Sequence, residues 1–131
     1  MEERFLIDSS AVIKYLNNSL PGAAIAFLDE ALDKEVNLSI ITKVEILAWV
    51  PPNPGDLLTV QQFAESAFVF MIDERIGNIA VSIRRATNVK LPDVLIAASA
   101  IAHDFTLIAD NDKDFDKIVA LGIGFRYLHR V

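Results

Sequence analysis

The stretch KLPDVLIAASAIAHDFTLIADNDKDF, residues 90–115, decides the fold of this chain. Pro92 suits the first turn of a helix, where its missing N–H costs nothing, and every residue from Val94 to Ala102 is apolar or small. We therefore expect a helix that is buried on most of its surface, followed at residues 105–108 by a short buried strand. One acid, Asp93, stands in the first turn of this helix, and more acids follow the strand.

The acids after the strand indicate a site, because charge beside buried elements is costly unless it is paired or bound to a metal. Within five positions the chain carries Asp110, Asn111, Asp112 and Asp114. Their spacing resembles the start of a calcium loop, which needs glycine at its sixth position and glutamate at its twelfth. This chain has Phe115 and Leu121 there, so a calcium loop is excluded.

The rest of the chain alternates short apolar segments with amphipathic ones, which is typical of an α/β fold. We expect a mostly parallel central sheet with helices on both faces, forming a single domain over residues 1–131. The third strand, which lacks any polar residue, should be covered on both faces. The expected strands are 4–7, 36–41, 68–72, 105–108 and 125–128. The expected helices are 11–16, one opening at 21, 42–49, 56–64, 73–86, 92–102 and 113–120.

Composition narrows the class of protein. Of the 131 residues 53% are apolar and the mean hydropathy is +0.37, which argues against disorder and suggests that a partner or a second copy covers some surface. The net charge of −6 argues against nucleic-acid binding by counterion release alone, unless the acids hold divalent cations. The chain has no cysteine, no apolar run long enough to span a bilayer and no signal-peptide pattern, so we expect a cytoplasmic protein.

Two further acids stand where a parallel sheet gathers its ligand sites. Asp8 follows the first strand, and Glu45 lies in the helix after the second. Each also has a purely structural interpretation. Asp8 is placed to cap a helix, and Thr42 with Glu45 has the spacing of a capping box.

The joint pattern favours a metal site. Three or four carboxylates in one pocket cannot all stay charged without a cation. Oxygen ligands without cysteine or a histidine pair indicate Mg²⁺ or Mn²⁺. Such ions activate water against phosphodiesters, so the chemistry we expect is metal-dependent phosphodiester hydrolysis.

Four sequence blocks, in order, resemble the PIN-domain family and, within it, the VapC-type toxins of toxin–antitoxin pairs. They are FLIDSSAVIKYL (5–16), SIITKVEIL (39–47), KLPDVLIAASA (90–100) and LIADNDKDF (107–115). The chain departs from the family pattern at Ala109, where the family usually has threonine or serine. The resemblance covers nearly the whole chain and implies a three-layer PIN-like fold.

The resemblance also implies roles for individual residues. The catalytic acids would be Asp8, Glu45, Asp93 and Asp114. Of these, Asp8, Asp93 and Asp114 would hold the metal, with Asp112 as the substitute for Asp114. Ser9, or its neighbour Ser10, and Asn111 would support the site.

The activity implied is that of an endoribonuclease, dependent on Mg²⁺ or Mn²⁺, that cuts RNA, is inhibited by a cognate antitoxin and forms a homodimer. Arg84, Arg85 and Lys90 precede the site helix and could contact the RNA backbone, with Lys14 as a weaker candidate. An alternative is a PIN fold kept as a binding or regulatory module with weak or absent catalysis. A phosphoryl-transfer enzyme with Asp8 as nucleophile is disfavoured, because Ser10 stands where a second aspartate is usually required.

Overall fold

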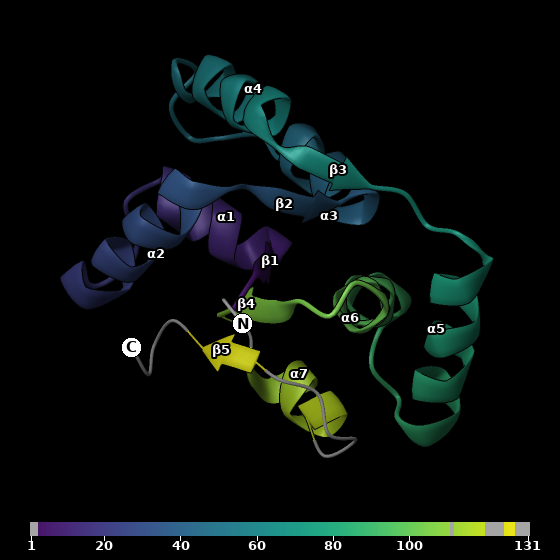
Figure 1. The fold of residues 1–131 in the computed structure, drawn as a ribbon. Helices are drawn as coiled ribbons and strands as arrows, with labels where there is room; N and C mark the ends of the chain where they lie inside the picture. Colours follow the sequence, from purple (N-terminus) through teal and green to yellow (C-terminus); the bar gives the residue numbers. More distant parts are fainter. Residues whose placement is uncertain (1–2, 111, 120–124, 128–131) are drawn as a thin grey trace.

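The computed structural model describes residues 3–110, 112–119 and 125–127 (Figure 1). Its elements follow the order expected from the sequence; four of the strands are shorter than expected, and the fourth strand is shifted by one residue. The strands are β1 (Phe5–Ile7), β2 (Asn37–Ser39), β3 (Phe68–Phe70), β4 (Thr106–Ala109) and β5 (Phe125–Tyr127). The helices are α1 (Ser9–Leu16), α2 (Gly22–Lys34), α3 (Ile40–Ala48), α4 (Asp56–Ser66), α5 (Glu74–Ala86), α6 (Leu91–Ala102) and α7 (Asp112–Val119).

All strand pairs are parallel, as expected. One sheet has the order β1-β4-β5, and β2 pairs with β3 beside it. The Asn37 side-chain amide, which is buried, donates to the Phe5 carbonyl oxygen at 3.0 Å and so links β2 to β1. The strands therefore run across the molecule as β3, β2, β1, β4 and β5 (Figure 1).

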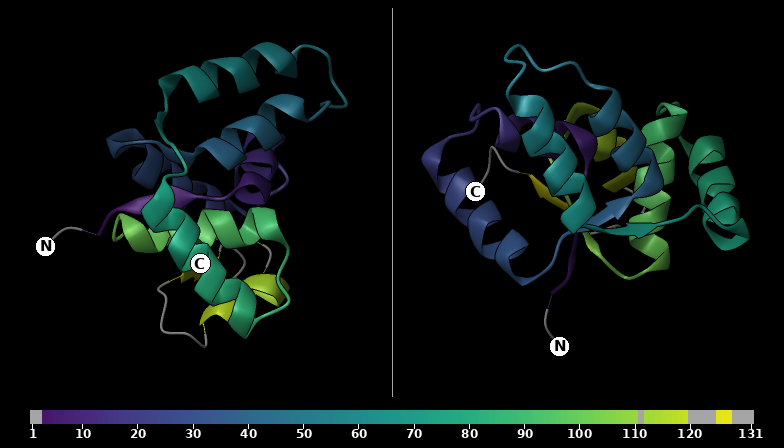
Figure 2. Two further views of the ribbon diagram at one scale, coloured as in Figure 1. Left: turned by 90° about the vertical axis from the view of Figure 1, so that its right-hand side faces the viewer. Right: turned by 90° about the horizontal axis from the view of Figure 1, so that it is seen from above.

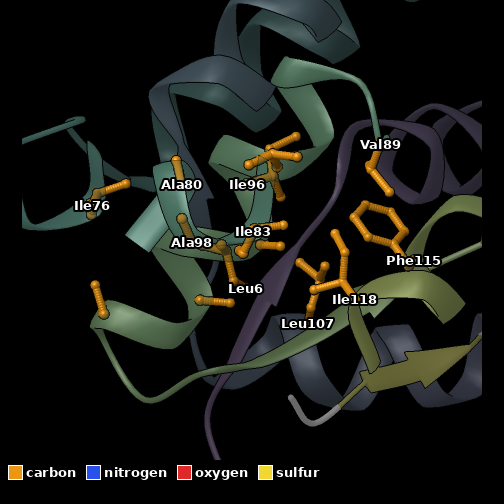
Figure 3. Packing of buried hydrophobic residues seen from close by; sticks show 14 of the residues in the cluster. Leu6, Ile76, Ala80, Ile83, Val89, Ile96, Ala98, Leu107, Phe115 and Ile118 are labelled. Carbon is orange, nitrogen blue, oxygen red and sulfur yellow. The ribbon is translucent and has the colours of Figure 1, made fainter. Parts of the chain in front are cut away.

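At β1 and β4 the sheet is covered on both faces, and successive side chains of each strand point in opposite directions. Leu6 and Leu107 belong to one buried cluster with side chains of α5, α6 and α7 (Figure 3). Their neighbours Ile7 and Ile108 belong to a second cluster with α1, α2, α3 and α4. Figure 2 shows the resulting separation of the helices into two groups. The expected three-layer α/β fold is confirmed.

Helix α6 is the most deeply buried of the helices that contribute to the first cluster. Its residues Ile96 to Ala100 are almost completely withdrawn from solvent, and α5 packs along it (Figure 2). The one polar side chain in this run, Ser99, donates its hydroxyl to the Leu95 carbonyl oxygen at 2.8 Å, which satisfies it inside the helix. As expected, Pro92 lies in the first turn.

Two local expectations were wrong. Strand β3 is not covered on both faces. It lies at the outer edge of the described strands, beyond β2, and Phe68 is 67% exposed. Thr42 and Glu45 do not form a capping box. Helix α3 begins earlier, with the Ser39 hydroxyl accepting the Ile41 N–H at 3.1 Å, so Thr42 lies inside the helix and its hydroxyl is buried.

Candidate active site

Asp8 is held at the carboxyl end of β1 by its backbone and its side chain. Its N–H donates to the Ile108 carbonyl oxygen at 2.9 Å, continuing the pairing of β1 with β4. Its Oδ1 accepts the Ala11 N–H at 2.9 Å as the N-cap of α1, and its Oδ2 accepts the Ser10 hydroxyl at 3.0 Å. Asp8 is only 3% exposed. The capping interpretation is therefore correct, and the same carboxylate is also deeply buried.

Glu45 reaches α1 from α3. Its Oε1 accepts the Ser9 hydroxyl at 2.6 Å, and the same hydroxyl lies 3.4 Å from the hydroxyl oxygen of Thr42. Ser9 and Asp8 are adjacent, so this contact brings Glu45 to the end of β1. The alternative interpretation, in which Glu45 caps its own helix, is therefore wrong, and Glu45 links two helices at the candidate site.

Electrostatic coupling ties the acids to one another. Burial raises the pKa of Asp8 to about 7; the Ala11 N–H and the Ser10 hydroxyl oppose this, and the charges of Asp93 and Asp110 add to it. Burial likewise raises the pKa of Asp93, with contributions from the charges of Asp114 and Glu45.

Lys90 works in the opposite direction and lowers the pKa of Asp93. Asp93 is half-buried in the first turn of α6, and Asp114 is half-buried on α7. The structure thus brings all four predicted acids into one electrostatic environment, delivered by four separate parts of the chain.

Three of these acids line one cavity of about 520 Å³. Its walls are Asp8, Ser9, Ser10, Ile13, Glu45, Ala48, Trp49 and Asp93. A larger hollow of about 700 Å³ lies at the opposite, amino-terminal end of β1, around Arg4 and Glu35. We assign the function to the smaller cavity, because the larger one is lined by an ion pair whose two charges already neutralise each other.

The predicted basic residues are divided between two places. Lys90 precedes α6 as its N-cap and acts on Asp93, so it lies at the site. Arg84 and Arg85 line a different hollow, of about 420 Å³, between α5 and α6. Arg84 also donates to the Val89 carbonyl oxygen at 2.6 Å, which secures the α5–α6 connection. The structure does not bring these two arginines to the acidic cavity.

Some features of the site were not foreseen. Trp49 and Ile13 line the cavity, each four positions along a helix from a polar site residue, Glu45 and Ser9; that spacing could have identified them. Lys14 forms an ion pair with Asp110, which no local sequence signal predicts.

Asn111 lies outside the described residues, as does the side chain of Asp112. Within the described part of the chain, no group of three or more histidine or acidic side chains is already arranged to hold a metal ion.

The fold and the site define an α/β domain that gathers carboxylates at the carboxyl ends of parallel strands. The sequence pattern of the PIN domain matches residues 5–121, and the chain therefore belongs to the PIN domain family. Proteins of this family are generally nucleases. Comparison with curated protein sequences found no match.

Solved structures with the same fold come from bacterial complexes. A toxin–antitoxin complex from Klebsiella pneumoniae has a chain that is 25% identical, with a TM-score of 0.66, and the match covers 84% of this chain and 88% of that one. The DNA-bound VapBC from Salmonella typhimurium gives 22% identity and a TM-score of 0.77, with coverages of 97% and 99%. VapBC2 from Rickettsia felis, bound to a promoter DNA fragment, has a chain that is 16% identical, with a TM-score of 0.77. The match covers 94% of this chain and 97% of that one. The expected resemblance to VapC-type PIN domains is confirmed in the fold. No helix among the described residues is both long and apolar enough to cross a membrane.

Proposed function

We propose that this protein is a metal-dependent endoribonuclease and the toxin of a type II toxin–antitoxin pair. The observation that carries the proposal is the environment of Asp8. Its carboxylate is almost completely buried, yet the charged groups that act on it are themselves acids, Asp93 and Asp110. Such an arrangement favours a bound cation, because a cation is what lets several buried carboxylates ionise together. Membership of a family of nucleases supports the same conclusion.

The donor set suits Mg²⁺ or Mn²⁺. The possible metal-ligand atoms of the side chains around the cavity are all oxygens, from carboxylates and hydroxyls, and these ions prefer oxygen ligands. Asp8, Asp93 and Asp114 are the proposed ligands, with Asp112 as the substitute for Asp114 and Asn111 in support. When bound, the cation would polarise the scissile phosphate and lower the pKa of a bound water.

The other residues of the cavity position the reactants. Ser9 holds Oε1 of Glu45 through its hydroxyl, which fixes this carboxylate and leaves Oε2 to accept a proton from an attacking water. Lys90, whose charge already acts on Asp93, is the proposed contact for the RNA backbone nearest to the site. Arg84 and Arg85 would contact a more distant part of the RNA, because they line the hollow between α5 and α6.

The partners we propose are a cognate antitoxin and a second copy of this chain, in the cytoplasm. The support comes from the toxin–antitoxin complexes among the structural neighbours and from exposed apolar side chains. Large apolar side chains are exposed on α3, just after it and on α4, which packs against α3, namely Val44, Leu47, Val50, Leu57 and Leu58. Exposed apolar groups gathered on neighbouring elements are typical of a surface that another chain covers.

The alternative proposal is a binding or regulatory module with weak or absent catalysis. One observation favours it: Ala109, the last residue of β4, is completely buried, so that position contributes a methyl group in place of the hydroxyl usual in the family. The two proposals differ in whether RNA is cut when the metal is bound.

The test is cleavage of a mixed RNA pool by purified protein with Mg²⁺ or Mn²⁺, with excess chelator and Asp93→Asn as the negative arms. Asp104→Asn is the matched control, since it makes the same change just beyond the other end of α6. Its backbone φ of 56° is one that asparagine tolerates well. We expect metal-dependent cleavage that Asp104→Asn retains and Asp93→Asn loses by at least about a hundredfold.

Cleavage that survives Asp93→Asn would contradict the proposed site. Metal binding without cleavage would favour the binding module. The metal binding of each variant is therefore measured alongside its activity, by calorimetry with Mn²⁺.

A further inference from the structure

One ion pair at the edge of the acidic cavity has no role in the function proposed above. Lys14, in the last turn of α1, pairs through Nζ with Oδ2 of Asp110, the first residue after β4. The Asp110 side chain is only 10% exposed, whereas that of Lys14 is 46% exposed. The pair therefore brings an ammonium group from the surface to a carboxylate that is largely removed from water.

Asp110 belongs electrostatically to the acidic group. Its charge contributes to the raised pKa of Asp8. Asp8 follows β1, and Asp110 follows the neighbouring parallel strand β4. Yet Asp110 does not line the cavity formed by Asp8, Glu45 and Asp93. Asp110 is thus turned to a lysine, whereas Asp8, Glu45 and Asp93 line the cavity.

This arrangement matters for the choice of metal ligands. A cluster of aspartates after β4 offers more carboxylates than one small cation needs, and Mg²⁺ in proteins is usually held by one or two carboxylates together with water. A carboxylate oxygen that accepts a hydrogen bond from an ammonium group is less available to a cation, because the ammonium already supplies the positive charge.

We propose that Lys14 is a positioning residue that withholds Asp110 from the metal and so leaves Asp8, Asp93 and Asp114 as its ligands. This inference rests on the proposed metal-dependent function. Lys14 then serves as an internal counter-cation: it balances the charge of Asp110 without entering the cavity. The ion pair sets the net charge seen by the metal, and its two members must act as a unit.

The test is a double-mutant cycle on Lys14→Met and Asp110→Asn, with Mn²⁺ affinity measured by calorimetry at fixed ionic strength. An uncompensated unit charge roughly 6 Å from a divalent ion changes its binding about tenfold at the dielectric constant of water. We expect Lys14→Met to bind Mn²⁺ up to about tenfold more tightly, because Asp110 is then unpaired. Asp110→Asn should bind several-fold more weakly, and the double variant should return to within about twofold of the unsubstituted protein.

Lys34→Met is the matched control, since Lys34 lines the hollow at the opposite end of β1. It removes the same charge and should leave Mn²⁺ affinity unchanged. A second readout uses no metal. In excess chelator, Lys14→Met should lower the melting temperature, because the largely buried Asp110 side chain loses its ion-pair partner, and adding Asp110→Asn should restore it.

The outcomes separate the alternatives. If Asp110→Asn and the double variant both lose Mn²⁺ binding by a hundredfold or more, Asp110 is itself a ligand and the inference is overturned. It is also overturned if Lys14→Met matches Lys34→Met in affinity and in melting temperature. If the unsubstituted protein takes up no Mn²⁺, the proposed function fails and the role of Lys14 towards a metal fails with it. The melting cycle in chelator then reports on the ion pair alone.

Discussion

The buried carboxylate of Asp8 should make the metal-free protein less stable as the pH rises. The pKa of Asp8 is raised from 3.8 to about 7 in the folded protein, so between these values the folded chain holds a proton that the unfolded chain has released. At about 1.36 kcal/mol for each tenfold change in proton affinity, ionising Asp8 costs the folded state about 4 kcal/mol at pH 8. This contribution is absent below pH 4 and grows through the range from 4 to 7.

Asp8→Asn isolates the effect, because the amide is nearly the same size and its oxygen can still accept the Ala11 N–H. We would measure the free energy of unfolding by urea denaturation in excess chelator at several pH values from 4.5 to 8. The difference between Asp8→Asn and the unsubstituted protein should increase with pH, in favour of the variant, towards about 4 kcal/mol as an upper value. Saturating Mn²⁺ should reverse the order, since a ligand that binds the ionised site stabilises only the unsubstituted protein.

Parallel stability curves for the two proteins from pH 4.5 to 8 would refute this reasoning. So would an unsubstituted protein that gains stability relative to Asp8→Asn towards alkaline pH without metal. Asp104→Asn serves again as the control, because it makes the same change at an exposed position just beyond the carboxyl end of α6.

Three further substitutions test the core and the charge balance of the site. Phe115→Ala should destabilise the fold by about 3–5 kcal/mol, because this ring is completely buried in the first cluster, next to Val89 (Figure 3). Phe68→Ala at the exposed β3 edge should cost less than about 1 kcal/mol. Thermal and urea unfolding would measure both, and equal losses would contradict the packing described. Lys90→Met should raise the pKa of Asp93 further, so the acidic limb of the pH–rate profile for RNA cleavage should move to higher pH; an unmoved limb would contradict the coupling.

Much of the fold followed from residue pattern. The apolar run from Val94 to Ala102 predicted a buried helix, because no amphipathic surface helix lacks a polar face over that length. The prediction that β3 is covered on both faces was wrong, because apolar composition does not indicate where a strand lies in a sheet. An edge strand and a central strand can have the same composition. Only the observed strand order distinguishes them.

The candidate site was likewise only partly predictable from the sequence. That acids would meet at one edge of the sheet followed from parallel-strand topology, because the carboxyl ends of parallel strands lie together. The hydrogen-bond or ion-pair partner of each acid could not be predicted from this topology. Glu45 had an adequate local partner in its own helix, and its bond to Ser9 arises only from the packing of α1 against α3. Lys14 and Asp110 lie 96 positions apart, so tertiary structure alone decides that they meet.

The parallel pairing of β1 with β4 has a consequence for synthesis of the protein. Ile7 finds its strand partner at Ile108, and Asp8 forms its backbone bond to that same residue. The emerging chain therefore carries Asp8 long before the ribosome has made the strand to which Asp8 is bonded. Contacts between such distant residues form slowly and late. The acidic cavity cannot assemble on a half-made chain, so any activity it supports is delayed until α6, β4 and α7 have left the ribosome.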